Sequence, residues 1–168
     1  AFKVSQISKK LGYPIKCIAI PKTVDNDLAI TDCCPGFGSA AKYIATSTME
    51  ASLDVASMSE TSTKVFILEV MGRHAGWMAA SSALARNSVG DAPHIILLPE
   101  VAFHQQKFLS KIKDVVKENG YCVVVASEGV KNNKGKFLSQ SNTKDAFGHS
   151  QLGGVAPYLA SLITEKLS

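Results

Sequence analysis

The sequence predicts an α/β fold in which helices cover both faces of a mainly parallel sheet. Apolar stretches such as Val65–Val70 and Tyr121–Ala126 run without alternation, which is typical of strands buried on both faces. Segments with apolar residues at helical spacing separate these stretches. The 168 residues are 46% apolar and 19% charged, a composition that suits a folded domain with a real core.

The N-terminal third contains two predicted helices and one predicted strand. Apolar residues at Val4, Ile7 and Leu11 indicate a short helix. Cys17–Ile20 is predicted to be a buried strand, and a polar, acidic loop follows from Lys22 to Asp32. Small and apolar residues then recur at helical spacing, so we expect a long helix from Gly36 to about Ser59.

The rest of the chain repeats the alternation of strand and helix. Gly129–Phe147 is rich in turn residues and is expected to form a loop or a small hairpin. The predicted elements are strand Val65–Val70, helix Ala75–Ala85, strand His94–Leu98, helix Gln105–Glu118, strand Tyr121–Ala126 and a helix from Val155 to Ser168.

Composition argues against several classes of partner. Eighteen Lys and Arg against fourteen Asp and Glu give a net charge of +4, and no basic run interleaved with aromatics suggests a nucleic-acid interface. No apolar stretch reaches the roughly 18 residues of a membrane span, so no membrane association is expected. The four cysteines show no C-x-x-C spacing, which favours free thiols in a reducing compartment and a cytoplasmic location.

Three segments that follow predicted strands contain side chains suited to catalysis or ligand binding. Open α/β folds bind ligands outside the carboxyl ends of their strands, which is where these segments are expected to lie. Pro21–Asp27 (PKTVDND) combines a cation, a hydroxyl and two carboxylates. One carboxylate beside a lysine or a metal ion is suited to act as a general base. An Asx-rich turn that only caps the next segment explains the same residues.

Met71–Gly76 (MGRHAG) sets Arg73 and His74 between two glycines before a helix. Glycines let the backbone approach a ligand, and a guanidinium grips phosphate oxygens through two donors. A tight strand-to-helix turn with an exposed arginine is the alternative. Glu128, in Ser127–Gly129, is placed to accept hydrogen bonds from sugar hydroxyls or simply to end a strand.

Together these motifs resemble the phosphofructokinase family. Pro21–Asp27 resembles its P-[KG]-T-[IV]-D-N-D loop, Glu69–Gly76 its E-V-M-G-R-x-x-G loop, and Leu98–Phe103 its P-E-x-x-F segment. Ser127–Gly129 is similar to its S/T-E-G segment. The resemblance covers nearly the whole chain and implies a Rossmann-like three-layer fold.

The resemblance implies transfer of a phosphoryl group to the 1-hydroxyl of fructose 6-phosphate, giving fructose 1,6-bisphosphate in glycolysis. Asp25 would be the general base, and Asp27 would hold the loop and the Mg²⁺ region as a metal ligand. Thr23 and Arg73 would stabilise the phosphoryl group in transfer. Lys22, the cation before the threonine, favours pyrophosphate as donor. The alternatives are ATP, or a non-catalytic sugar-phosphate-binding fragment or regulatory subunit.

The resemblance implies that the sugar site is lined by Met71, Gly72, Arg73 and Glu128. Lys64, seven residues before Met71, occupies a position where many family members carry an arginine that reaches the sugar phosphate of a neighbouring subunit. A lysine keeps the charge but loses the bidentate fork. Because the residue at this position would reach a neighbouring subunit, the resemblance suggests a homo-oligomer.

The resemblance also predicts the domain organisation. Residues 1–32 would be the end of a donor-side domain that carries the catalytic loop, and residues 33–168 an incomplete fructose 6-phosphate-binding domain. We expect the chain to be a piece of a longer enzyme, because the upstream donor motif is absent from it. Phe147–Gly154 only partly resembles the family's Q-R motif, since Leu152 stands in place of arginine. His149 is expected to be structural.

Overall fold

A three-stranded parallel sheet forms the centre of the computed structural model, which describes residues 1–20, 22–144, 150–152 and 154–167. Its strand order is β1 (Val65–Val70), β3 (Cys122–Ser127) and β2 (Ile95–Leu97). Val65 pairs with Cys122 and Val70 with Ser127, so β1 and β3 end level with each other. Every residue of β3 is buried, as a central strand covered on both faces requires.

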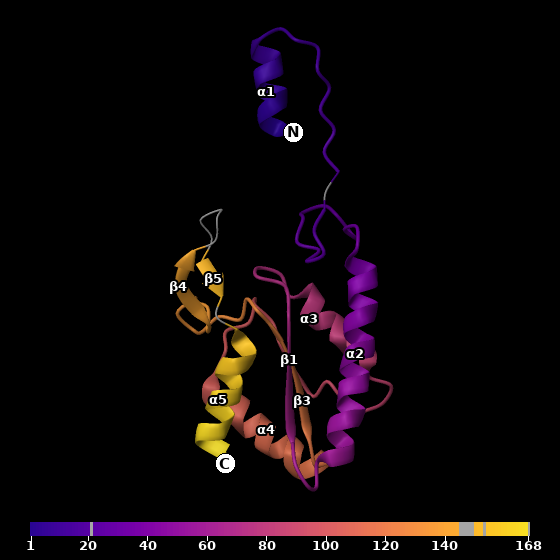
Figure 1. Ribbon diagram of the computed structural model, residues 1–168, viewed down its shortest axis with the longest axis vertical. Coiled ribbons are helices and arrows are strands. Elements are labelled where there is room, and N and C mark those ends of the chain that lie inside the picture. The colour runs from indigo at the N-terminus through magenta and orange to yellow at the C-terminus, as the bar shows by residue number, and fades with distance from the viewer. Residues whose placement is uncertain (21, 145–149, 153, 168) are drawn as a thin grey trace.

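Helices cover both faces of this sheet, as predicted (Figure 1). On one side lie α2 (Phe37–Met58) and α3 (Trp77–Ser81), which continues into a short 3₁₀ helix, η1 (Ser82–Ala85). On the other side lie α4 (Gln105–Asn119) and α5 (Val155–Leu167). The main core lies between the sheet and this second pair of helices, and its members include Ile112, Val124, Ala126, Val155 and Leu159.

The predicted strand at Cys17–Ile20 is wrong. This segment is irregular, and the side chains of Ile18 and Ile20 are 88% and 83% exposed. A strand needs a neighbouring strand for its N–H and C=O groups, and none of the described residues pairs with this segment. The segment instead links α1 (Phe2–Lys10), which stands apart from the sheet, to the loop that precedes α2 (Figure 1).

The region after β3 forms a small hairpin, one of the two forms predicted for it. Lys131 bridges Phe137 in antiparallel fashion, and the N–H of Leu138 donates to the carbonyl of Val130 at 3.0 Å. Next come β4 (Gln140–Lys144) and β5 (Ser150–Leu152), which pair antiparallel. Among the described residues, no helix is long and apolar enough to cross a membrane.

Candidate functional site

Two of the segments singled out in the sequence meet at one end of the sheet. The Met71–Gly76 loop follows the end of β1, and the Lys22–Asp27 turn lies near that same end, above α2 and α3 (Figure 1). Arg73, His74 and Lys22 are close enough to Asp25 for their charges to act on its carboxyl group. The fold therefore brings the acidic turn and the arginine loop together, although about fifty residues separate them in the sequence.

The surroundings of Asp25 shift the pKa of its carboxyl group. Burial raises the pKa of its carboxyl group, the nearby Asp27 raises it further, and the basic side chains of Arg73, His74 and Lys22 oppose the rise. Its Oδ1 atom is buried and has no hydrogen-bond partner among the described residues. A carboxylate with a free oxygen next to cationic side chains is suited to accept a proton from a bound hydroxyl.

The backbone of the turn is held locally. The N–H of Asp25 donates to Thr23 Oγ1 at 3.2 Å, an ST-turn contact that ties the hydroxyl to the carboxylate residue. Thr23 and Asp25 are half-buried, whereas Lys22 and Asp27 are exposed. The turn thus leaves one cation and one carboxylate open to a ligand.

The arginine loop is held against the end of β3. Ser127, fully buried, donates its hydroxyl to the carbonyl of Gly72 and accepts the N–H of Gly129 at 3.1 Å. Gly72 has φ of 128°, a conformation that favours glycine. At Gly129 the backbones approach so closely that a Cβ atom would lie 2.1 Å from the carbonyl oxygen of Arg73. Two of the glycines in these loops are therefore required by geometry.

The far end of the same loop is held by an acidic side chain. The N–H of Gly76 donates to Glu100 Oε1 at 2.7 Å, so the P-E-x-x-F segment after β2 supports the start of α3. Arg73 Nε is buried without a hydrogen-bond partner among the described residues. Its guanidinium therefore has a donor for which the described part of the chain provides no acceptor.

The remaining predicted residues fall into two groups. Met71 is exposed and Gly72 buried, and the N–H of half-buried Glu128 donates to the carbonyl of Val70 at 2.9 Å, so all three lie where β1 and β3 end. Lys64 precedes β1 and lies at the other end of the strand, about 20 Å away at 3.3 Å per residue. His149 and the side chain of Leu152 lie outside the described part of the chain.

Three side chains gain importance only in the structure. His74 lies near Asp25 and packs against Phe137 with 6.2 Å between ring centroids. Ser127 supports the arginine loop, and Asn26 makes two hydrogen bonds within its own loop. The position of Asn26 between two aspartates in a turn was a usable sequence signal, whereas the contacts of His74 and Ser127 depend on the tertiary fold.

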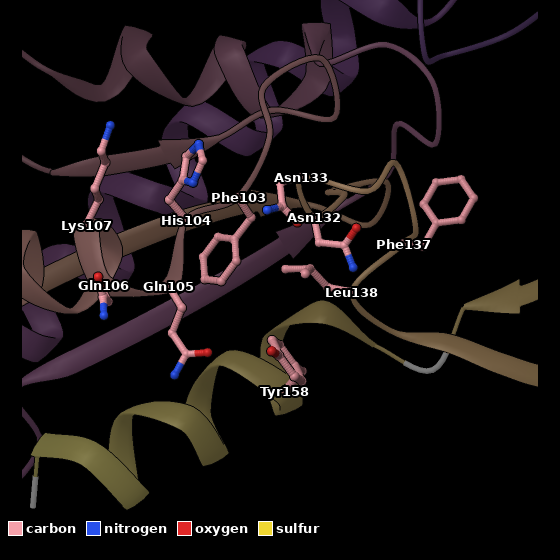
Figure 2. A pocket seen from close by; sticks show the side chains of 10 residues that line it. All are labelled: Phe103, His104, Gln105, Gln106, Lys107, Asn132, Asn133, Phe137, Leu138 and Tyr158. Carbon is pink, nitrogen blue, oxygen red and sulfur yellow. The ribbon is translucent and has the colours of Figure 1, made fainter.

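A separate pocket of about 470 Å³ lies beside this site at the start of α4. Figure 2 shows Gln105, Asn132 and Tyr158 arranged around Phe103 and Leu138, while Phe137 lies at its edge. None of the residues predicted for catalysis lines this pocket. Phe137 contacts both the pocket and His74, so it marks the boundary between the pocket and the two loops.

Comparison with known proteins gives consistent results. The family model described as "Phosphofructokinase" matches residues 2–168. Pyrophosphate--fructose 6-phosphate 1-phosphotransferase from Halomonas elongata is 61% identical over 165 residues, which are 98% of this chain and 39% of that protein. The protein of the same name from Xanthomonas campestris is 60% identical over 168 residues, 99% of this chain and 40% of that protein.

A solved structure shows that the resemblance extends to the fold. The crystal structure of pyrophosphate-dependent phosphofructokinase from Marinobacter aquaeolei superposes with a TM-score of 0.83 at 57% identity, covering 99% of this chain and 38% of that one. The chain thus spans about 40% of the length of the curated relatives it matches. The motifs, the family model and the fold agree, and the chain belongs to the phosphofructokinase family.

Proposed function

We propose that this chain contributes the acceptor side of an enzyme that transfers a phosphoryl group from pyrophosphate to the 1-hydroxyl of fructose 6-phosphate, giving fructose 1,6-bisphosphate. The observation that carries the proposal is the meeting of Asp25 with Arg73 and Lys22 at the end of the sheet. The names of relatives 60% and 61% identical to this chain support pyrophosphate as the donor.

In the proposed reaction Asp25 accepts the proton of the 1-hydroxyl as its oxygen attacks the phosphorus. The new bond joins that oxygen to phosphorus, the bridging bond of pyrophosphate breaks, and inorganic phosphate leaves. Arg73, Thr23 and Lys22 stabilise the charge on the phosphoryl group and the leaving phosphate. The pKa of Asp25, raised by burial, makes its carboxylate a better proton acceptor than an exposed aspartate.

The sugar is proposed to bind along Met71, Gly72, Arg73 and Glu128, where β1 and β3 end. Lys64 is too far from these residues to serve the same site within one chain, because it lies at the opposite end of β1. Its proposed role is therefore in a site of a neighbouring subunit, which requires a homo-oligomer.

Mg²⁺ fits the acidic turn as an ion shared with the substrate. The described residues contain no group of three or more His, Cys, Asp or Glu side chains that could hold a metal alone. Mg²⁺ is commonly bound through one or two carboxylates together with substrate phosphates. Asp27, which is exposed, is the proposed ligand, and two residues away lies the buried Oδ1 of Asp25, which has no hydrogen-bond partner within the described ranges. When bound, the ion would neutralise phosphate charge.

Turnover by the full-length protein, measured first with pyrophosphate and then with ATP, tests the proposal. We expect activity with pyrophosphate, and activity with ATP alone would overturn the choice of donor. Asp25→Asn should lower kcat by about 10²-fold or more, because general-base catalysis contributes about 10² to 10⁴. Asp114→Asn, an exposed carboxylate on α4, is the matched control. Unchanged kcat in Asp25→Asn would refute the assignment of the base.

A cytoplasmic location is also proposed. All four cysteines are free thiols in the structure, and Cys34 and Cys122 are buried. Free thiols are the usual state of cysteine in a reducing compartment. Fractionation of cells that express the full-length protein would test this.

A further inference from the structure

Asn26 separates Asp25 from Asp27 and is the buried polar side chain of the Lys22–Asp27 turn. It is 7% exposed, whereas Asp27 is exposed. Its Nδ2 donates to the carbonyl of Asp32 at 3.2 Å, and its Oδ1 accepts the N–H of Cys34 at 2.8 Å. Both ends of the amide group are therefore used, and both reach the same short segment.

The backbone of Asn26 is also specialised. Its φ is 55°, in the left-handed region, which asparagine tolerates better than most residues with a Cβ atom. The chain therefore changes direction at this residue, between the two carboxylates. A side chain that is hydrogen-bonded at both ends and a left-handed backbone together restrict how the turn can move.

The segment that Asn26 holds is itself attached to a rigid element. Cys34 is 1% exposed, and its carbonyl accepts the N–H of Phe37, the first residue of α2, at 3.1 Å. Gly36 approaches the turn as well, because a Cβ atom there would lie 3.2 Å from Val24 Cγ1. Asn26 thus connects the acidic turn to the start of the 22-residue helix α2.

We propose that Asn26 is a positioning residue of the phosphoryl-transfer site: its side-chain bonds to Asp32 and Cys34 clamp the turn so that Asp25 and Asp27 keep their places relative to Arg73. This inference rests on the proposed function for its kinetic consequence. Asn26 acts through the two aspartates, because both functional groups of its amide are already bonded within the protein.

Two variants of the full-length protein test the clamp. Asn26→Gly keeps access to the left-handed backbone and removes the side chain, and Asn26→Ala removes the side chain and also strains the backbone. In both, kcat should fall by about 10²-fold, the loss typical of a misplacement of about 1 Å, while KM for fructose 6-phosphate stays within about twofold. Asn119→Ala, which loses a side-chain bond to the carbonyl of Val115 on α4, is the matched control and should keep the parent's kcat.

Amide hydrogen exchange at Cys34 provides a readout that does not depend on activity. The N–H of Cys34 should exchange at least about tenfold faster in Asn26→Gly than in the parent, since it loses its acceptor. Unchanged exchange at Cys34, or a kcat of Asn26→Gly within twofold of the parent, would overturn the inference. A parent without turnover on either donor would refute the proposed function, and exchange at Cys34 would still decide whether the clamp exists.

Discussion

Replacing Gly129 with alanine should disturb the arginine loop by a calculable amount. The added methyl group would lie 2.1 Å from the carbonyl oxygen of Arg73 and 2.8 Å from its Cα atom. Ordinary van der Waals contact begins near 3.4 Å, so the two backbones must separate by about 1.3 Å. Both sides of the contact are backbone, and neither can rotate away as a flexible side chain would. Arg73 therefore has to move with its loop.

The displacement has two expected effects in the full-length protein. Overpacking costs about 1 to 3 kcal/mol, which lowers the midpoint of thermal unfolding by a few degrees or more. Arg73 is proposed to stabilise the transition state, and a shift of about 1 Å in such a residue lowers kcat by about 10²-fold. Thermal unfolding followed by circular dichroism measures the first effect, and steady-state turnover with pyrophosphate measures the second.

Gly38→Ala is the matched control, because nothing lies within 4 Å of a Cβ atom at that position. Gly38 is in α2, where alanine is a better helix former, so this variant should unfold at the same or a higher temperature. A Gly129→Ala variant that unfolds at the parent's temperature and keeps its kcat would refute both the close approach and its effect on Arg73. A lower unfolding temperature with unchanged kcat would confirm the close approach and refute the role of Arg73.

Three further predictions concern stability. Ser127→Ala should cost about 1 to 3 kcal/mol in urea unfolding, because two buried backbone groups lose their partner; no change in the midpoint would contradict this. Leu159→Ala should cost about 2 to 5 kcal/mol, because Leu159 is fully buried in the core against α4; a cost under about 1 kcal/mol would mean the core is loosely packed. Burial and the charge of Arg86 lower the pKa of His94 in the folded protein, so as the pH falls the unfolded chain binds a proton at this residue first. The free energy of unfolding therefore falls as the pH drops below about 6.5, by at most about 1.4 kcal/mol per pH unit. In His94→Asn, the side-chain oxygen can accept the N–H of Val123 in place of His94 Nδ1. The unfolding temperature of this variant should fall less than the parent's between pH 7.5 and 5.5. A fall identical to the parent's would show that His94 is not the cause.

Much of the fold could be predicted from local pattern. Continuous apolar strands such as Val65–Val70 and the helical spacing of α2 and α4 lie close to where the sequence places them. The parallel sheet and its covering on both faces follow from that alternation. Cys17–Ile20 has the same apolar character as the true strands, but a strand is stable only when it is paired.

The site divides in a similar way. The sequence alone determined which residue types are present, namely the two carboxylates, the lysine and the arginine, and their motifs identified the family. It also placed Arg73 after a true strand, at the end of the sheet where ligands bind in open α/β folds, whereas the apolar segment before the lysine and the two carboxylates is not a strand.

Only the tertiary structure decided which of these residues meet. Lys64 precedes β1 and Arg73 follows it, so this strand of six residues holds them apart, whereas Asp25 and Arg73 come together from distant segments. One support of the site, Ser127 against Gly72, depends on close approach between separate pieces of backbone, whereas Asn26 bonds to Cys34 within a single loop. Long-range contacts such as that of Ser127 with Gly72 are set by how the elements pack, and no spacing within one segment of the sequence encodes them.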